Sequence, residues 1–215
     1  MDSLMQESLV PWSLNGVSQP PLLCTKQDEE AMLIGHLLTS GLIDSAACVH
    51  SIRPAGDAWL VSAHVSGKAG TPALLRLDTM PPNRSGRTVS AERLNRLCGQ
   101  VMALDHAAGL HSVLLWDGEK SVVGRDVGRH NALDKAVGMA VKEGLRLDQA
   151  VLCSSGRLSL EMFAKAALAG IPILATRKQV GNLSVSYGEK LDIAVCRTGT
   201  ETVCYASPWR VTASC

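Results

Sequence analysis

The sequence is poor in aromatic residues and has no large imbalance of charge. Aromatic side chains make up 3% of its 215 residues, so the core must be packed from aliphatic side chains, and few rings are available on which nucleic-acid bases could stack. Lys and Arg (21) nearly balance Asp and Glu (20), which gives a formal net charge of +1. Such a chain has no overall electrostatic attraction to nucleic acid or to anionic membranes. We therefore expect neither as a partner.

Long apolar runs are also missing. No segment approaches the length that a membrane-spanning helix needs, and the first residues, MDSLMQESLVPW, lack the basic start and apolar centre of a signal peptide. These features predict a cytoplasmic protein with reduced thiols. The seven cysteines are irregularly spaced, and no two stand in a Cys-x-x-Cys arrangement. This pattern argues against a disulfide framework and against a zinc site.

The first part of the chain predicts a small β-rich unit. Two apolar runs within Val10–Thr25 flank Asn15-Gly16, a hairpin signal, and Pro20-Pro21 in the second run indicates an edge strand. Thr25 is the expected N-cap of a following helix that ends at Gly41. A strand is expected at Ala58–Val65, and then a loop over 67–86 with a possible short strand at Ala73–Leu77.

From Ser90 onward, helical and strand patterns alternate. Helices are expected at Ser90–Ala108, Asn131–Glu143, Leu158–Ala169 and Gly181–Glu189, and strands at His111–Trp116, Lys120–Gly124, Ala150–Cys153, Ile171–Thr176, Ile193–Arg197 and Glu201–Ala206. This alternation predicts a layered α/β domain with a mixed sheet. We divide the chain into an N-terminal appendage of hairpin, helix, strand and loop, residues 1–88, and an α/β cofactor-binding domain, residues 89–215.

The segment Arg125–Lys135, RDVGRHNALDK, is the strongest candidate for a binding site. It follows a predicted strand and precedes a predicted helix, where open α/β folds place ligand loops. A helix start offers free N–H groups, and cationic side chains suit phosphate. The candidate ligand-binding residues here are Asp126, Gly128, Arg129, His130, Asn131 and Lys135. The simpler alternative is a solvated loop in which Asn131 caps the helix.

Three further segments are expected to meet this one at the strand ends. The first is the loop Ser154–Arg157, in which Ser155, Gly156 and Arg157 could hold a phosphate group. The second is the turn formed by Val195, Cys196, Arg197, Thr198, Gly199 and Thr200, and the third is Gly109–His111. Taken alone, each is more simply interpreted as an ordinary loop, a plain hairpin or a structural histidine.

Several of these segments resemble the FdhD/NarQ family, the accessory proteins of formate dehydrogenase. RDVGRHNALDK differs from the family string EDVGRHNALDK only at Arg125. DEEAMLIGHLLTSGLID, residues 28–44, is similar to the family's DEDLALGFLLTEGII, and SSGRLSLEMFAKAALAGIP, residues 154–172, is similar to SSGRASYEMVQKAAMAGIP. The hairpin around Asn15-Gly16 also resembles the family's opening. The likeness covers nearly the whole chain in the expected order.

The resemblance implies a fold, a cofactor and partners. The larger unit should have the cytidine-deaminase-like fold, and the turn at 195–200 should contact the molybdenum bis-molybdopterin guanine dinucleotide cofactor, for which GDP is a natural mimic. Formate dehydrogenase and a cysteine desulfurase are the implied partners, and we expect a homodimer. Deaminase chemistry itself is not expected, because His111 is followed by Ser112-Val113 rather than by the His-x-Glu of the zinc deaminases, and no Cys-x-x-Cys exists.

One departure from the family affects the expected chemistry. Family members transfer sulfur through a Cys-x-x-Cys loop between the strand at Ala58–Val65 and the helix that starts near Ser90, and this chain has no cysteine there. No catalytic residue can therefore be carried over. Cys153 is the only weak substitute, expected to be buried, and Cys98 is weaker still.

Three functions remain open at this point. The first is an FdhD-like accessory protein in which sulfur transfer is in doubt. The second is a non-catalytic carrier or chaperone of guanine nucleotide or molybdenum cofactor. The third is an unrelated enzyme that uses His130 and Asp126 as an acid–base pair. The loop Val65–Pro82 is either an anion-binding segment or a solvated connector.

Overall fold

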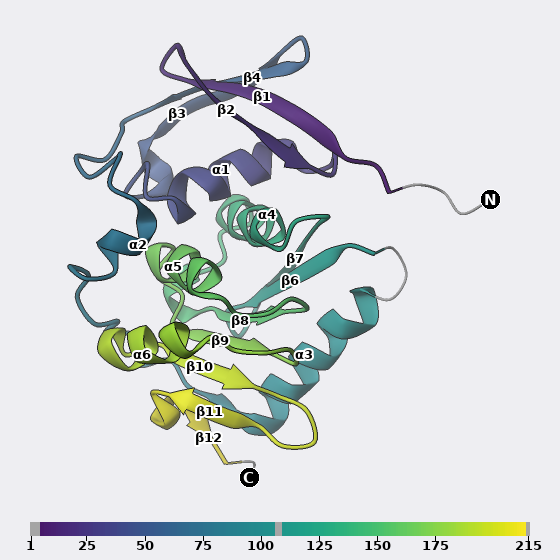
Figure 1. The fold of residues 1–215 in the computed structure, drawn as a ribbon, viewed down its shortest axis with the longest axis vertical. Coiled ribbons are helices and arrows are strands. Elements are labelled where there is room, and N and C mark those ends of the chain that lie inside the picture. The colour runs from purple at the N-terminus through teal and green to yellow at the C-terminus, as the bar shows by residue number, and fades with distance from the viewer. Residues whose placement is uncertain (1–4, 106–108, 214–215) are drawn as a thin grey trace.

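The computed structural model describes residues 5–105 and 109–213. Figure 1 shows a stack of layers: a small sheet, the helix α1, the helices α4 and α5, and a larger sheet with α3 beyond it. The predicted layered α/β fold with a β-rich N-terminal unit is confirmed. Within the described ranges, no helix combines the length and the apolar character needed to cross a membrane.

The small sheet contains β1 (Ser8–Leu14), β2 (Val17–Cys24), β3 (Val49–Ala55) and β4 (Ala58–Ala63), in the order β2-β1-β4-β3. The predicted hairpin is confirmed, since Asn15 and Gly16 both adopt positive φ between β1 and β2. The strand β2, which carries both prolines, lies at the edge of the sheet as expected. One face of this sheet packs on α1 (Glu29–Thr39).

The larger sheet is mixed, with the strand order β11-β10-β9-β8-β6-β7. Its strands are β6 (His111–Trp116), β7 (Ser121–Asp126), β8 (Val151–Ser154), β9 (Ile173–Thr176), β10 (Ala194–Arg197) and β11 (Val203–Ala206). The strands β8, β9 and β10 are parallel, whereas β6, β7 and β11 pair antiparallel with their neighbours. A separate short pair joins β5 (Val89–Ser90) to β12 (Val211–Thr212).

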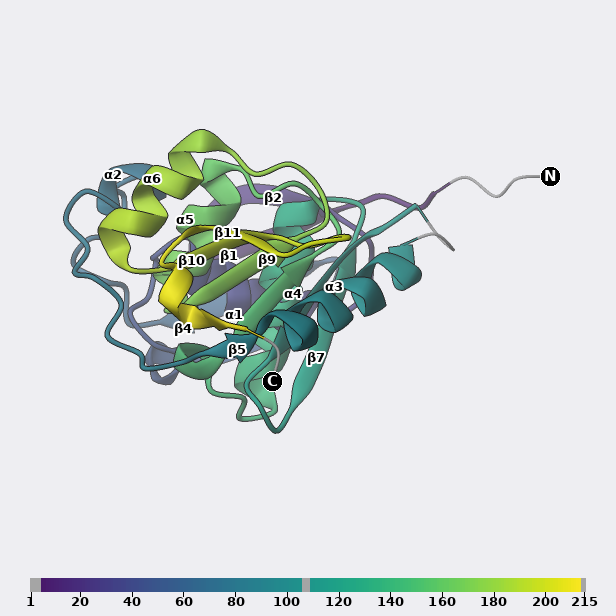
Figure 2. The same cartoon turned by 90° about the horizontal axis from the view of Figure 1, so that it is seen from below.

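Helices cover both faces of the larger sheet. The helix α3 (Ala91–Asp105) packs on one face, and α4 (Arg129–Lys142), α5 (Leu160–Leu168) and α6 (Asn182–Leu191) lie toward the other, as Figure 2 shows from below. The α3 face has its own apolar cluster, which includes Leu94, Leu97, Cys98 and Cys153. Residues 106–108 of the predicted Ser90–Ala108 helix lie outside the described residues.

The helices α1 and α4 join the two sheets into one hydrophobic core. They pack so closely that a Cβ atom on Gly35 would overlap the carbonyl of Asp134, and one on Gly138 would overlap the carbonyl of Ala31. Glycine at these two positions permits direct contact between the helix backbones. The division at residue 88 into separate folding units remains a prediction.

Two local predictions are wrong, and one strand was missed. Residues Ala73–Arg76 form a short helix, α2, rather than a strand. The strand β3 was not expected, because Val49–Ala55 has little apolar alternation and its side chains are mostly exposed. Helix α1 begins at Glu29, after Asp28 with a φ of 55°, so Thr25 is not its N-cap. In each case, the contacts of the folded chain outweigh the local pattern.

Thr25 instead joins the first β-unit to the Arg125–Lys135 segment. Its backbone N–H donates to Asp126 Oδ2 at 3.0 Å, and its hydroxyl accepts from the N–H of Val127 at 3.2 Å. The fully buried ammonium of Lys135 lies 2.7 Å from Asp126 Oδ2 and also donates to the carbonyls of Thr25 and Arg125. The buried pair has good geometry and extra hydrogen bonds, the conditions under which such a pair is tolerated.

We predict that Lys135→Met strongly destabilises the protein. Removing one partner leaves the Asp126 carboxylate buried without compensation, which costs about 3–5 kcal/mol. Urea denaturation would measure the loss. The matched control is Lys142→Met on the same helix, where the exposed pair with Glu30 should contribute less than about 1 kcal/mol. Equal, small losses in both variants would contradict a structural role for the Asp126–Lys135 pair.

Candidate functional site

The topology brings the four predicted binding segments to one edge of the larger sheet. His111, the first residue of β6, pairs with Asp126, the last of β7, and Ser154 at the end of β8 pairs with Thr176 at the end of β9. Arg197 at the end of β10 also pairs with Thr176. The loops that follow β7, β8, β9 and β10 therefore leave the sheet side by side, together with the segment that enters β6. We call this region the strand edge.

A cavity of about 270 Å³ lies at the strand edge between α4 and the loops after β8 and β9. Its wall is formed by Arg129, Arg157, Leu158, Ser159, Gln179, Val180 and Gly181. Gly156 is packed so tightly that an added Cβ would stand 3.3 Å from Arg129 Cβ and 3.5 Å from His111 Nδ1. This glycine therefore lets the Ser-Ser-Gly-Arg loop, the start of α4 and the start of β6 lie against one another.

Several buried polar atoms at the strand edge have no hydrogen-bond partner among the described residues. They are Arg129 Nε, His111 Nδ1 and Ser112 Oγ. Buried polar groups are normally hydrogen-bonded, so these unpaired atoms are candidates for hydrogen bonds with a ligand. No side chain of the described residues caps the start of α4 either, which leaves N–H groups of its first turn available to an anion.

The turn after β10 is held at the same edge by two hydrogen bonds to its backbone. The N–H of Thr198 donates to the carbonyl of Thr176 at 2.9 Å, and the side-chain amide of Asn95 on α3 donates to the carbonyl of Gly199 at 3.0 Å. Arg197 and Thr200 are exposed, whereas Val195 and Cys196 are buried within β10. Of the predicted turn residues, Arg197 and Thr200 are thus exposed and Gly199 is half-buried, whereas Thr198 is buried and Val195 and Cys196 lie within the sheet.

The sequence analysis missed two cations at this edge. Arg177 and Lys178 directly follow β9 and are exposed. Arg177 donates to Asn95 Oδ1 at 3.1 Å, which places its guanidinium beside the turn after β10. The sequence did contain a signal for Arg177 and Lys178, because cationic residues directly after a buried parallel strand lie where such folds bind ligands. Together with Arg129, Arg157 and Arg197, they make the strand edge strongly basic.

The other predicted residues of the Arg125–Lys135 segment bond to neighbouring parts of the protein. Asp126 and Lys135 have no exposed side-chain surface, and their bonds go to protein atoms. Asp126 Oδ1 also accepts from the N–H of Gly128 at 2.9 Å. Asn131 is not an N-cap, because α4 begins at Arg129 after Gly128. The side-chain amide of Asn131 donates to the carbonyl of Leu23 and to Asp126. Ser155 likewise accepts from the N–H of Ser112 at 2.9 Å.

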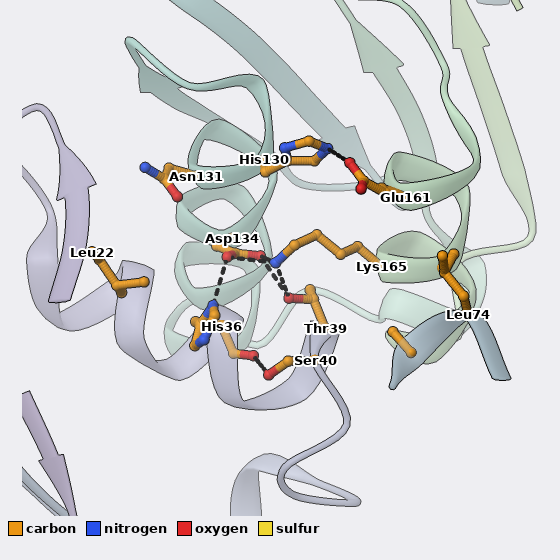
Figure 3. Close-up of a pocket in the computed structure, with 12 residues that line it drawn as sticks. Leu22, His36, Thr39, Ser40, Leu74, His130, Asn131, Asp134, Glu161 and Lys165 are labelled. Atoms are coloured by element: carbon orange, nitrogen blue, oxygen red, sulfur yellow. Dashed lines mark hydrogen bonds and ion pairs between the residues drawn. The ribbon is translucent and has the colours of Figure 1, made fainter. Parts of the chain in front are cut away.

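A second cavity, of about 320 Å³, lies between the helices and is shown in Figure 3. We call it the helix pocket; it is lined by Leu22, His36, Thr39, Ser40, Ala73, Leu74, His130, Asn131, Asp134, Glu161, Ala164 and Lys165. At its centre, Lys165 Nζ lies 2.7 Å from Asp134 Oδ2, Thr39 donates to Asp134 Oδ1 at 2.6 Å, and His36 Nδ1 lies 3.2 Å from Asp134 Oδ2. Burial raises the pKa of the Asp134 carboxyl, but Lys165 and His36 outweigh this effect and lower it to about 2.

His130 lines the helix pocket, whereas its neighbour Arg129 lines the strand-edge cavity. In Figure 3 its imidazole points to Glu161, at 3.4 Å between Nε2 and Oε2. Burial and the nearby charges of Arg129 and Lys165 lower the pKa of His130, which favours the neutral ring at pH 7. Asp126 is already engaged by Lys135, so the hypothesis of a His130–Asp126 acid–base pair finds no support in the geometry.

The segment that replaces the expected cysteine loop reaches the helix pocket. Its short helix α2 contributes Ala73 and Leu74 to the lining, and no cysteine is among the lining residues. Cys153, the weak substitute nucleophile, is fully buried in β8, as expected, and burial raises the pKa of its thiol well above the ordinary value. A buried neutral thiol is a poor nucleophile.

Comparison with known proteins places this arrangement in a family. Residues 5–212 match the FdhD/NarQ family. The sulfur carrier protein FdhD of Streptomyces avermitilis is 39% identical over 223 residues, which cover 86% of this chain and 79% of that protein. The protein of the same name from Mycolicibacterium paratuberculosis is 30% identical over 232 residues, covering 90% and 85%.

The fold comparison agrees. A crystal structure described as that of a formate dehydrogenase accessory protein from Desulfotalea psychrophila superimposes with a TM-score of 0.80. The match covers 96% of this chain and 90% of the other at 21% identity, and so concerns the fold. The family match over nearly the whole chain, the two curated relatives and the Arg125–Lys135 segment at the strand edge lead to one conclusion: the chain belongs to the FdhD/NarQ family.

Proposed function

We propose that this protein serves the maturation of formate dehydrogenase by binding the molybdenum bis-molybdopterin guanine dinucleotide cofactor at the strand edge. The observation that carries the proposal is that Arg129 and Arg157 line one cavity beside an uncapped helix start, while unpaired buried polar atoms and Arg197, at the end of β10, lie along the same strand edge. Diphosphates carry the charge and the acceptor oxygens that such groups bind. The proposal includes formate dehydrogenase as the enzyme that receives the cofactor.

The residues present fit a guanine dinucleotide in a simple division of roles. Arg129, Arg157 and the first turn of α4 would hold phosphate groups. The turn formed by Arg197, Thr198 and Gly199 would meet the base, because it offers donors within a fixed backbone. Asp126 and Lys135 would contact no ligand and would keep the start of α4 in place.

A second candidate function is a carrier that binds the cofactor without transferring sulfur. It is favoured by the apolar residues Ala73 and Leu74 at the wall of the helix pocket, in the segment where family members carry their cysteines. Sulfur transfer from a cysteine desulfurase needs an exposed thiolate, and residues 60–89 contain no cysteine. The two functions share the cofactor and differ in the chemistry.

We predict that GDP binds and that ADP binds more weakly. The strand edge offers cations to both diphosphates, so only the turn after β10 can discriminate between the bases. Isothermal titration calorimetry with each nucleotide measures the difference. Equal affinities, or no heat from either at millimolar concentration, would argue against a guanine dinucleotide site.

We predict that Arg129→Ala weakens GDP binding by about 10- to 150-fold, which corresponds to a lost charge-assisted contact of about 1.5–3 kcal/mol. His130→Ala should cost less, because its imidazole faces the helix pocket. The matched control is Arg96→Ala, an exposed arginine on α3 that pairs with Glu92. Equal binding by Arg129→Ala and Arg96→Ala, with unchanged melting temperatures, would remove Arg129 from the site.

We predict that this protein alone does not restore formate dehydrogenase activity to a strain that lacks its own FdhD. A sulfur relay needs an accessible thiolate in the segment where family members carry their cysteines, and residues 60–89 contain no cysteine, while Cys153 is buried. Enzyme activity in extracts would be assayed beside a strain rescued by a family member with both cysteines. Rescue by this chain would contradict the carrier function, and its loss in Cys153→Ser would identify a substitute thiol.

A further inference from the structure

Four of the seven cysteines lie on the α3 face of the larger sheet. Cys98 of α3, Cys153 of β8 and Cys196 of β10 belong to one buried apolar cluster, and Cys204 of β11 packs against it. Cys196 and Cys204 are direct partners across the β10–β11 pair, and their Sγ atoms lie 2.9 Å apart. No three His, Cys, Asp or Glu side chains of the described residues form a group that could hold a metal ion.

We propose that Cys196 and Cys204 form a reversible disulfide bond that closes the hairpin carrying the turn after β10. The sulfur atoms need to approach by only about 0.9 Å to reach the S–S bond length of about 2.05 Å. The strand β11 is the last strand of the sheet and has β10 as its only neighbour in it. It can therefore adjust to the bond without disturbing a second ladder.

The two thiols differ in a way that defines their roles. Cys204 is partly exposed, whereas Cys196 is fully buried. The hydrogen bond that Cys196 donates lowers the pKa of the Cys204 thiol, and the same bond, together with burial, raises the pKa of Cys196. Cys204 is thus the thiol that reacts with an external partner, and Cys196 is the one that resolves the product.

The chemistry is thiol–disulfide exchange with a low-molecular-weight disulfide as the oxidant. The Cys204 thiolate attacks one sulfur of that disulfide, forms a mixed disulfide and releases one small thiolate. The Cys196 sulfur, after losing its proton, then attacks Cys204 Sγ, forms the Cys196–Cys204 bond and releases the second small thiolate. The protein loses two electrons and two protons, and the small disulfide is reduced to two thiols. A small dithiol reverses the sequence.

The bond would act on the strand edge through the chain between the two cysteines. That segment contains Thr198 and Gly199, which bond to Thr176 and to Asn95. A covalent link across the base of the hairpin restricts the backbone of residues 197–203. The inference concerns the hairpin itself and does not depend on which ligand, if any, the turn holds.

Trypsin makes the bond directly measurable. Cleavage after Lys190, Arg197 and Arg210 places Cys196 on peptide 191–197 and Cys204 on peptide 198–210, so only a disulfide joins them. The reduced full-length protein is incubated with glutathione disulfide, remaining thiols are alkylated, and the peptides are analysed by mass. We expect the joined peptide pair, which dithiothreitol abolishes. Cys48→Ser, which alters a partly exposed cysteine outside this cluster, should give the same pair.

Cys204→Ser should abolish the joined peptides. Cys196→Ser should instead accumulate glutathione on Cys204, which shows the order of attack even if that variant is less stable. In the wild type, oxidation should slow amide hydrogen exchange of residues 198–203 several-fold, with no oxidant effect in Cys204→Ser. Persistent glutathione on Cys204 in the wild type, a bond from Cys196 to Cys98 or Cys153, or unchanged exchange after oxidation would overturn the proposal.

Discussion

The buried ion pair of Asp126 and Lys135 is the interaction on which the site depends. It joins the last residue of β7 to the second turn of α4, and through the carbonyl of Thr25 it also holds the N-terminal β-unit. The two buried side chains cannot move far apart, because separating them would leave each charge buried without its partner. The position of Arg129 at the strand edge therefore follows from contacts that no ligand touches.

The second constraint is the close packing of α1 on α4. Gly35 and Gly138 remove the side chains that would separate the two helices. Asp134 of α4 then lies within reach of His36 and Thr39 of α1, and Lys165 of α5 completes its bonds. The helix pocket thus contains a charged network in which Asp134 is bonded by Lys165, Thr39 and His36.

The sequence was sufficient to predict much of the fold, and the reasons are local. Asn15-Gly16 specifies a hairpin turn, and the alternation of strands and helices after Ser90 specifies a layered sheet. The same alternation placed the binding segments at one edge. The sequence could not show which polar residues face inward. Lys135 was predicted to bind phosphate, but in the folded chain its ammonium is buried against Asp126 and the carbonyl of Thr25. The Asp134 network was missed because His36, Thr39 and Lys165 are distant from Asp134 in the chain.

Arg129 and His130 are adjacent in the chain, yet they face different cavities. They belong to the same first turn of α4, so a displacement of that turn cannot alter one cavity without altering the other. A ligand in one cavity that shifted this turn against the Asp126–Lys135 pair would change the affinity of the other cavity for a ligand of its own, and thermodynamic linkage would make the effect equal in the reverse direction. Two adjacent residues would thus couple the strand edge to the helix pocket without any change in the fold.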